Sequence, residues 1–453
     1  MVTAEVDVAV VGMGVGGEEV AGRLAEAGLA VVGIESRLVG GECPYYGCVP
    51  SKMMIRAANL LAEARRIPGM AGESEVRPDW APVARRIREE ATDNWNDKVA
   101  VDRFTDKGGQ FRRGFGRVTG HGRVEVDGET FLARRAVVLG VGTAPAVPPI
   151  EGLSDTPYWT NREAIEAETL PASMLVLGGG AIGLELAQAY ARFGVTVTVV
   201  EALDRLLAIE EPESSVLAAA ALARDGIAIR TGAKAVLVAH DGAEFALTLD
   251  DGTRLTAERL LVATGRRANL NDLGIDSIGL DPTAHGITVD DRMRAAEDVW
   301  AVGDVTGRGA FTHVAMYQAG IAVRDILGRD GPPADYRALP RVTFTDPEIG
   351  GVGLTEAQAR EAGVRVQVGL TNLPSSARGW IHKAGNDGFI KLVADADRGM
   401  LVGATSAGPV GGEVLAGLAV AMHGRVPVDR LRHMIYAYPT FHRAIEDALR
   451  DLS

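Results

Sequence analysis

The sequence predicts an α/β protein with two Rossmann-like nucleotide-binding domains and a third, C-terminal α+β domain. A strand–helix–strand unit with a glycine-rich turn opens the chain, and a second copy of it begins near residue 174. After about residue 340, strand-like pieces mix with helices. A repeat of this length indicates an internal duplication of a nucleotide-binding unit, not a short-period solenoid. With 453 residues the chain is also too long for one core, so two to four domains are expected.

The first unit begins with a short buried strand over residues 6–11. After the glycine turn, an amphipathic helix is expected over about 18–27, followed by a second strand over 29–34. At the turn the hydrophobic pattern changes from a continuous apolar run to a helical face. This change is typical of a strand–helix–strand unit.

The second unit repeats the same order of elements. A strand is expected over 174–177, a helix over about 182–193 and a second strand over 196–200. Between the two units lies a mainly helical stretch, about 53–107, with polar turns. A strand that ends in glycines and prolines, "VVLGVGTAP", lies between the two units. A matching segment, 258–270, follows the second unit.

Each unit carries a G-x-G-x-x-G triplet between its first strand and its helix. The first glycine permits the turn, the second lets the backbone approach a pyrophosphate, and the third lets helix and strand pack closely. The helix N-terminus then offers N–H groups and a positive dipole end to phosphates. The second strand of each unit ends in a glutamate that can accept the ribose hydroxyls of an adenosine. These residues are Gly12, Gly14, Gly17 and Glu35 in the first unit, and Gly178, Gly180, Gly183 and Glu201 in the second.

Glu201 also favours NADH over NADPH. A carboxylate at this position suits a free 2′-hydroxyl and repels a 2′-phosphate. Arg205 lies close by in sequence and would soften this preference, so NADPH stays possible.

Composition excludes several classes of partner. Apolar residues make up 47% and charged residues 24%, which is typical of a globular protein. The net charge of −13 argues against nucleic acid or an anionic membrane as partner. No apolar run is long enough to span a membrane, and two cysteines do not make a secreted disulfide framework. We therefore expect a cytoplasmic protein.

The two cysteines, Cys43 and Cys48, lie in the stretch "GGECPYYGCVPSK". As a structural staple they would close only a short loop, and cytosolic disulfides are seldom structural. As a metal site they lack two of the four usual ligands, and no histidine is near in sequence, so no metal is expected. A redox pair is the favoured interpretation, and positive charge from Lys52 could lower the thiol pKa.

With these residues in view, the chain resembles the pyridine nucleotide-disulfide oxidoreductases, the family of dihydrolipoamide dehydrogenase, glutathione reductase and mercuric reductase. The resemblance covers nearly the whole chain, and "GGECPYYGCVPSK" is similar to the redox-disulfide segment of that family. It implies an FAD-binding domain over 1–150 and 268–338, an NAD(P)H-binding domain over 151–267 and a dimerisation domain over 339–453. A homodimer is also implied, because the terminal segment normally completes the site of the other subunit.

The resemblance also implies roles for single residues. Cys48 would be the cysteine nearer the flavin, and Cys43 the exposed thiol that attacks the substrate. Lys52 and Glu185 match an ion pair that the family places beside the flavin, where the lysine charge stabilises the reduced flavin. Further cofactor-binding positions implied by the matching segments are Gly116, Gly142, Gly265, Asp304 and Ala315.

The terminal segment departs from the family pattern. Where the family has His-Pro-Thr-x-x-Glu, an acid–base dyad, this chain reads "YPTFHR", with Tyr438 for the histidine and Arg443 for the glutamate. Tyrosine, with an ordinary pKa near ~10, is a poor base but a possible acid. His442 would lie one turn from Tyr438 if the segment is helical, and it is a second candidate catalytic residue.

Other departures lie around the cysteines. Glu42 stands where threonine is common in the family, and Tyr45 and Tyr46 add two phenols between the thiols. Packing is expected for at least one of these tyrosines. Substrate stacking or proton donation is the alternative.

The expected function is an FAD-dependent oxidoreductase that passes electrons from NAD(P)H through flavin and a Cys43–Cys48 disulfide to a small disulfide, or that oxidises a dithiol in the reverse direction. The alternative is direct flavin reduction of a quinone, a metal ion or oxygen without disulfide turnover, which the missing dyad favours. A non-catalytic FAD-binding subunit is the least expected.

Overall fold

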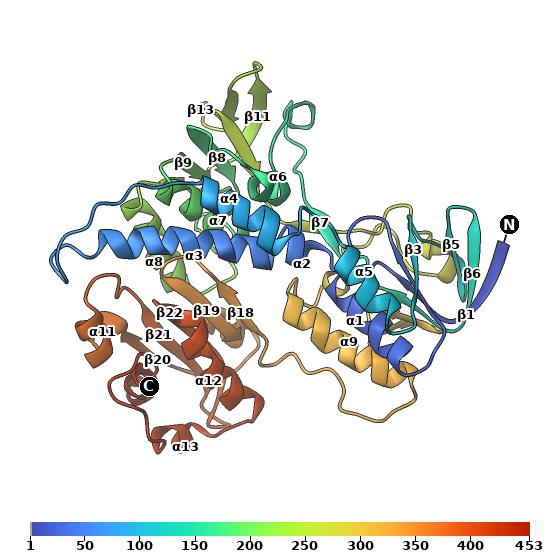
Figure 1. Cartoon of the computed structure of the whole chain (residues 1–453). Helices are drawn as coiled ribbons and strands as arrows, with labels where there is room; N and C mark the ends of the chain where they lie inside the picture. Colours follow the sequence, from blue (N-terminus) through green and yellow to red (C-terminus); the bar gives the residue numbers. More distant parts are fainter. Residues whose placement is uncertain (1) are drawn as a thin grey trace. The chain divides into compact units, whose positions relative to one another are not determined.

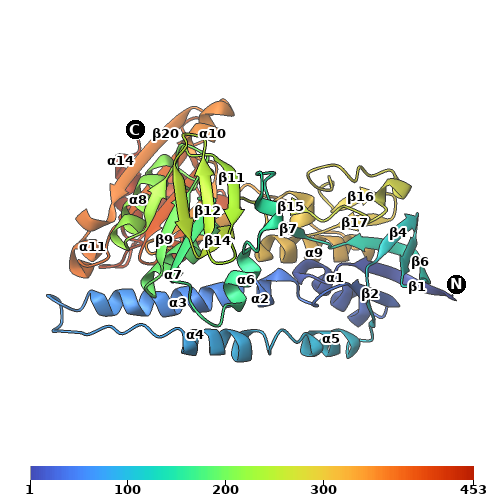
Figure 2. The same cartoon turned by 90° about the horizontal axis from the view of Figure 1, so that it is seen from above.

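The computed structural model describes residues 2–453, and the chain forms two compact units (Figures 1 and 2). The first comprises Met1–Ser51, Ala84–Ala146 and Gly265–Asp335. The second comprises Lys52–Val83, Val147–Thr264 and Tyr336–Ser453. One copy of the duplicated strand–helix–strand unit therefore falls in each. The finer domain boundaries expected from the family stay a prediction.

A mostly parallel sheet organises the first unit. Its strand order is β16-β17-β6-β1-β2-β3, with β5 paired to β6 and β4 to β5. Residues 8–11 of the central strand are buried, which is typical of a parallel strand covered on both faces. The strands are β1 (Val2–Val11), β2 (Val31–Glu35), β3 (Gln110–Arg113), β4 (Arg117–Gly120), β5 (Arg123–Val126), β6 (Glu129–Leu139), β16 (Arg294–Ala296) and β17 (Val299–Ala301).

Helices α1 (Val15–Glu26) and α9 (Thr312–Ile326) lie side by side in this unit, and α1 also contacts α5 (Lys98–Thr105) (Figures 1 and 2). The first helix begins at Val15, earlier than the expected residue 18, because Gly14 of the turn is its N-cap. A short antiparallel ladder of β7 (Thr143–Pro145) and β15 (Arg266–Ala268) completes the unit, together with the 3₁₀ turns η3 (Ile275–Ile278) and η4 (Asp304–Thr306).

The cysteine segment forms two consecutive helices, α2 (Glu42–Tyr45) and α3 (Cys48–Arg65). The division between the two units falls within α3, between Ser51 and Lys52. The rest of the expected helical stretch consists of α4 (Ala81–Arg86), a π-helical turn η1 (Ile87–Ala91) and α5.

The second unit contains a parallel sheet in the order β10-β9-β8-β14, built on the second copy of the duplication. Beside it lies a three-stranded antiparallel sheet, β11-β12-β13 (Figure 2). The strands are β8 (Ser173–Leu177), β9 (Thr196–Val200), β10 (Ala228–Arg230), β11 (Ala235–His240), β12 (Phe245–Leu249), β13 (Arg254–Ala257) and β14 (Arg259–Val262); the helical elements are η2 (Leu153–Asp155), α6 (Asn161–Glu166), α7 (Ala181–Arg192) and α8 (Pro212–Arg224).

The C-terminal part of this unit is a five-stranded antiparallel sheet in the order β18-β19-β22-β21-β20. Its core joins strand residues such as Ile390 and Leu392 to helix residues such as Leu415 and Leu449. The elements are β18 (Pro340–Thr343), β19 (Glu348–Gly353), β20 (Val366–Asn372), β21 (Phe389–Asp395), β22 (Met400–Gly408), α10 (Glu356–Glu361), η5 (Leu373–Ser375), α11 (Ala377–His382), α12 (Gly411–His423), α13 (Val428–Arg432) and α14 (Ala444–Asp451).

A buried lysine on β21 binds three carboxylates within the second unit. Lys391 is 4% exposed, and its Nζ lies 3.0 Å from Glu211, 2.8 Å from Glu213 and 3.0 Å from Glu356. Burial alone would lower the pKa of Lys391, but its hydrogen bonds to Glu213, Glu356 and Glu211 raise that pKa above its usual value. The three donors of the ammonium group are thereby satisfied.

Within residues 2–453, no helix is long and apolar enough to cross a membrane.

Candidate active site

The first glycine turn leaves space on one side only. Gly12 has a φ of +86°, and a Cβ on it would lie 2.7 Å from the Gly140 backbone. A Cβ on Gly17 would overlap the carbonyl oxygen of Gly12. On Gly14 the nearest atom would be 3.8 Å away. The turn is therefore closed where it packs and open at Gly14, which is where a pyrophosphate approaches in such turns.

Glu35, at the end of β2, closes this turn. Its two carboxylate oxygens accept hydrogen bonds from the backbone N–H groups of Met13 and Arg37, each at 2.8 Å. A carboxylate has about four lone-pair sites, so Glu35 keeps acceptor capacity for ribose hydroxyls. The first-turn N–H groups of α1 have no acceptor within the helix and suit a phosphate.

The second glycine turn repeats this design. Gly178 has a φ of +115°, and a Cβ on Gly183 would overlap the Gly178 carbonyl oxygen. A Cβ on Gly180 would meet nothing within 4 Å. Glu201 accepts hydrogen bonds from the N–H groups of Gly179 at 2.6 Å and Leu203 at 2.8 Å.

Arg205 holds the loop that follows Glu201. Its guanidinium donates hydrogen bonds to the carbonyl oxygens of Leu207, Ala208 and Glu210, and to the Ser215 hydroxyl, at distances from 2.6 to 3.3 Å. These contacts occupy the guanidinium with its own loop, so in this conformation it is not directed to a nucleotide.

Asp304 lies in a polar chain within the first unit. The Thr143 hydroxyl donates a hydrogen bond of 2.9 Å to Asp304, and Arg266 donates one of 2.7 Å to Thr143. Burial raises the pKa of Asp304 above its usual value, against the opposing effects of Thr143 and Arg266. Glu42 lies 3.7 Å from Arg266, so the extra carboxylate of this chain has a cationic neighbour.

The other predicted cofactor positions cluster in the first unit. Gly142 and Gly265 have φ values of +61° and +122° at the ends of the β7–β15 ladder. A Cβ on Gly116 would lie 3.0 Å from the side chains of Val11 and Ile34. Ala315 is buried in α9, and its Cβ lies 3.4 Å from the position that a Cβ on Gly16 would take.

The two cysteines flank the junction of α2 and α3. Cys43 is half-buried in α2, and Cys48 is exposed as the first residue of α3, so the expectation that Cys43 is the exposed thiol of the pair is wrong for this structure. The Cys48 sulfur lies 3.4 Å from the hydroxyl of Thr312, the first residue of α9. The structure thus brings Cys48 to the helix that carries Ala315. Sequence reasoning missed Thr312, because nothing in its local pattern distinguishes it.

Lys52 and Glu185 form the predicted ion pair inside the second unit. Their charged atoms are 2.8 Å apart, and Glu185 is only 6% exposed. Glu185 also accepts a hydrogen bond of 2.8 Å from the backbone N–H of Phe344, and the Lys52 ammonium lies 4.7 Å from the centre of the Phe344 ring. Phe344 is a further residue of this cluster that the sequence did not indicate.

Tyr45 and Tyr46 differ in their surroundings. Tyr45 is buried, and its pKa is raised first by that burial and then by Asp97 and Glu18. Tyr46 stacks against Trp95, with ring centres 6.5 Å apart and planes inclined by 25°. Tyr45 therefore packs, as expected for at least one of the pair.

The terminal segment is not helical at Tyr438. Helix α14 begins only at Ala444, so the helical segment that would place His442 one turn from Tyr438 is not present. Tyr438 is 70% exposed, and the Arg443 guanidinium lies 5.5 Å from the centre of its ring. The His442 ring instead neighbours Tyr436, with centres 6.0 Å apart.

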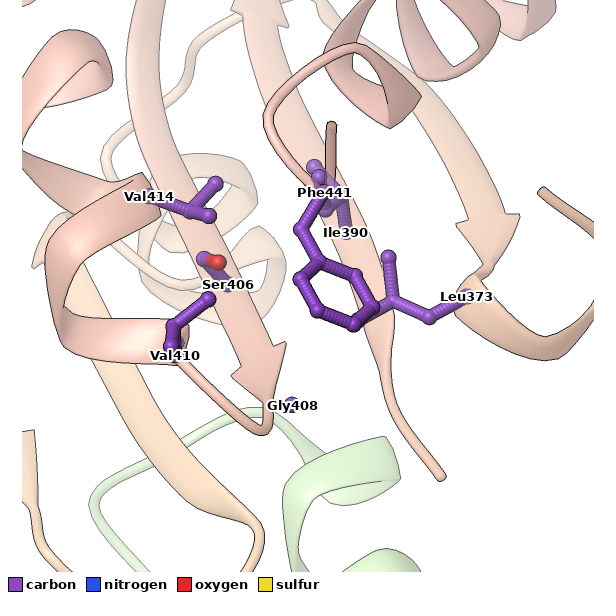
Figure 3. Close-up of a pocket in the computed structure, with 8 residues that line it drawn as sticks. Leu373, Ile390, Ser406, Gly408, Val410, Val414 and Phe441 are labelled. Atoms are coloured by element: carbon purple, nitrogen blue, oxygen red, sulfur yellow. The ribbon is translucent and has the colours of Figure 1, made fainter. Parts of the chain in front are cut away.

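A small apolar pocket also lies in the C-terminal sheet, around Phe441 (Figure 3). It has no room for a water-sized molecule, and Ser406 supplies its one hydroxyl, so it offers little to a polar substrate. The side chains drawn are those of Leu373, Ile390, Ser406, Val410, Val414 and Phe441.

Among the described residues, 2–453, no group of three or more histidine, cysteine, aspartate or glutamate side chains could hold a metal ion.

Comparisons with known proteins match this arrangement. Residues 6–319 match the family model described as pyridine nucleotide-disulphide oxidoreductase, and residues 339–449 match its dimerisation domain. The chain is 34% identical to a mercuric reductase of Shigella flexneri, over 96% of this chain and 78% of that protein. It is 33% identical to a dihydrolipoyl dehydrogenase of Thermus scotoductus, over 98% and 97%.

Solved structures are similar over almost the whole chain. A copper(II) complex of the flavoprotein disulfide reductase RclA from Escherichia coli has a TM-score of 0.87 and 25% identity, covering 99% of both chains. The structure of LpdA from Mycobacterium tuberculosis has a TM-score of 0.85 and 26% identity, again covering 99% of both. The predicted fold class is confirmed.

Proposed function

Because this chain belongs to the pyridine nucleotide-disulphide oxidoreductase family, we propose that Cys43 and Cys48 are its redox-active pair and that a small disulfide is its electron acceptor. The enzyme is an NAD(P)H-dependent flavoprotein oxidoreductase that uses FAD and NAD(P)H. The observation that carries the proposal is the position of the two cysteines at the α2–α3 junction, with Cys48 against the start of α9. Dithiol oxidation is the same chemistry in reverse.

The residues of the first unit fit FAD. The open side of Gly14 and the N-terminus of α1 suit the pyrophosphate, and Glu35 suits the adenosine ribose. Asp304, already oriented by Thr143, suits a polyol chain. When bound, FAD supplies the two-electron chemistry that links NAD(P)H to the thiols. We assign Gly116, Gly142, Gly265 and Ala315 to the same site.

Lys52 is proposed to hold positive charge beside the cofactor. The buried Glu185 fixes the ammonium group, and the Phe344 ring covers it. A fixed cation stabilises negative charge that develops nearby, and it costs no reorganisation at the moment of reaction.

NADH is proposed as the preferred donor, bound at Gly178, Gly180, Gly183 and Glu201. Glu201 presents a carboxylate to the ribose, and Arg205 is engaged by its own loop. A 2′-phosphate would therefore meet negative charge without a guanidinium to bind it.

A second candidate acceptor is a thiophilic metal ion, and a quinone or oxygen are further alternatives. Tyr438 and Arg443 stand where the family has its acid–base dyad, and a metal ion bound by thiolates needs no proton from a side chain. A mercuric reductase and a copper(II) complex of a disulfide reductase among the similar proteins support this candidate. If disulfides are turned over, Tyr438 and His442 are the residues proposed to supply the proton.

The dimerisation domain supports a homodimer. We further propose a cytoplasmic location, consistent with the use of NAD(P)H and with only two cysteines. Neither nucleic acid nor a membrane is proposed as a partner.

The test is steady-state reduction of a disulfide, Cu(II), Hg(II) and a quinone with NADH or NADPH, in the wild type and in Cys43→Ser and Cys48→Ser. We expect NADH to be preferred by about tenfold or more, the ratio that about 1.4 kcal/mol of differential binding gives. Disulfide turnover should be lost in both variants. Disulfide turnover that survives Cys43→Ser would refute the proposed pair, and metal reduction without disulfide turnover would establish the second candidate.

A further inference from the structure

One residue of the second unit, Phe344, contacts both partners of the Lys52–Glu185 pair. Its backbone N–H donates to one Glu185 oxygen at 2.8 Å, and Lys52 donates to the other oxygen at 2.8 Å. The Phe344 ring also lies 4.7 Å from the Lys52 ammonium group, within the range of a cation–π interaction. The position of the Lys52 charge therefore depends on the position of Phe344.

The segment that carries Phe344 lies outside any backbone ladder. The pairing of β18 with β19 ends at Thr343 and Ile349, and residues 344–347 belong to no helix or strand. The strand before them, β18, is the edge strand of its sheet. Because buried backbone groups need hydrogen-bond partners, side chains from other elements have to hold this segment in place.

Gln188 of α7 supplies such a partner. Its carboxamide oxygen accepts from the Asp346 N–H at 2.7 Å, and its amide nitrogen donates to the Asp346 carbonyl oxygen at 3.0 Å and to Asp225 at 2.8 Å. The side chain is buried, and it lies one turn after Glu185 on the same face of the helix. This face of α7 thus binds the backbone at two alternate residues, Phe344 and Asp346.

The helix that carries Lys52 is tied to the same segment. Arg192 of α7 and Arg66 of α3 both donate to the Asp346 carboxylate, at 2.7 and 2.6 Å. Arg192 also donates to Asn59 of α3 at 2.6 Å. Helices α3 and α7 therefore meet at Asp346, and the ion pair between them lies at one end of a continuous hydrogen-bonded network.

We propose that Gln188 is a positioning residue for Lys52. It fixes the backbone of Asp346, and thereby the N–H and the ring of Phe344, so that the ammonium group keeps one place. The inference rests on the proposed function of Lys52 as the cation beside FAD. A cation held in place stabilises negative charge without reorganisation, whereas a cation that moves loses part of this effect.

The test is the midpoint potential of bound FAD in the holoenzyme. Both cysteines are replaced, Cys43→Ser/Cys48→Ser, so that no thiol pair exchanges electrons with the flavin, because the chain has only 2 cysteines. Gln188→Met keeps most of the side-chain volume and removes both bonds to Asp346. It should disfavour flavin reduction about 3- to 10-fold, a negative shift of about 15 to 30 mV for a two-electron couple.

Two comparisons separate positioning from a general loss of stability. Lys52→Met should shift the potential further in the same direction, and Gln188→Met added to it should bring no further shift, because the cation is already gone. Gln358→Met makes the same chemical change at another glutamine of the second unit, whose carboxamide accepts from the Thr355 N–H at 3.0 Å. It should leave the potential unchanged.

An unchanged potential in Gln188→Met would overturn the proposal, and so would a shift of equal size in the Lys52→Met background. If Lys52→Met itself leaves the potential unchanged, the proposed function of Lys52 fails, and crystal structures decide on the positioning separately. In Gln188→Met the Phe344 N–H should lie beyond hydrogen-bond distance of Glu185. Distances that stay at 2.8 Å from Glu185 to Phe344 and to Lys52 would refute the positioning.

Discussion

Replacing Lys391 by methionine should destabilise the second unit strongly. Methionine keeps most of the side-chain volume and removes the ammonium group. Glu211, 3% exposed, would then lie buried beside Glu213 and Glu356 without its cation. The loss of stability comes more from the uncompensated buried charge than from the lost contacts.

The magnitude follows from the burial of the partners. Breaking a buried pair by removing one partner costs about 3–5 kcal/mol. Glu213 and Glu356 are 38% and 28% exposed, so water stabilises part of their charge, and Glu211 carries most of the penalty. With a urea m-value of about 3 kcal/mol/M, the midpoint should fall by about 1 M or more.

The assay is urea denaturation followed by circular dichroism over a range of pH. The pKa of Glu356 is lowered by its hydrogen bond to Lys391 and then by Arg360. Its contribution to stability is therefore present above pH 4.5 and is lost as the pH falls through the folded-state pKa. The pKa of Lys391 is raised, so its contribution is present below 10.5 and is lost as the pH rises through the folded-state pKa. The difference in unfolding free energy between wild type and variant should therefore be constant from pH 4.5 to pH 10.5 and become smaller on either side.

Glu213→Gln is the matched control, because it removes the most exposed of the three carboxylates and should cost about 1 kcal/mol or less. The double variant Lys391→Met/Glu211→Met should recover part of the lost stability, since it removes the buried charge as well as its partner. A loss in Lys391→Met no larger than in Glu213→Gln, or one that grows as the pH falls below 4.5, would refute the reasoning.

Three further changes probe residues that are proposed to serve the cofactor sites. Glu185→Gln should slow flavin reduction by NADH about tenfold, as seen by stopped-flow absorbance, because Lys52 loses its buried anion; an unchanged rate would remove the pair from the site. Gly17→Ala should give protein with little bound FAD, because the new Cβ overlaps the Gly12 carbonyl, whereas the helical Gly417→Ala, with open space around it, should retain FAD; equal flavin content would contradict this. Arg205→Ala should raise the KM for NADH about tenfold by releasing its loop and bring no change specific to NADPH; a loss confined to NADPH would mean that Arg205 binds the 2′-phosphate.

The duplicated units were predictable because their signals are local. Hydrophobic runs, glycine spacing and terminal glutamates all lie within about 30 residues of one another, and they set the strands, turns and helices in the observed order. The bounds were less predictable. Helix α1 starts at Val15 because the glycine turn itself caps it, a detail that periodicity does not report.

Contacts between distant segments were not predictable. Thr312 reaches Cys48 across 264 residues, and Thr143 reaches Asp304 across 161. Lys391 reads from sequence as an ordinary strand lysine, and only the fold shows its three partners. The position of His442 relative to Tyr438 depended on whether the segment is helical, which the sequence left open, and the chain forms a turn there before α14.

The two glycine turns offer a way to separate folding from ligand binding genetically. In each turn the outer glycines are required by the backbone, whereas the middle ones, Gly14 and Gly180, have room for a methyl group. Alanine at either position should therefore give a folded protein that fails to bind one nucleotide only, FAD for Gly14→Ala and NAD(P)H for Gly180→Ala. A cell carrying the Gly14 allele and a cell carrying the Gly180 allele would reveal which phenotypes depend on the flavin and which on the nicotinamide nucleotide. Co-expressing the two alleles would show whether subunits of a mixed dimer complement each other.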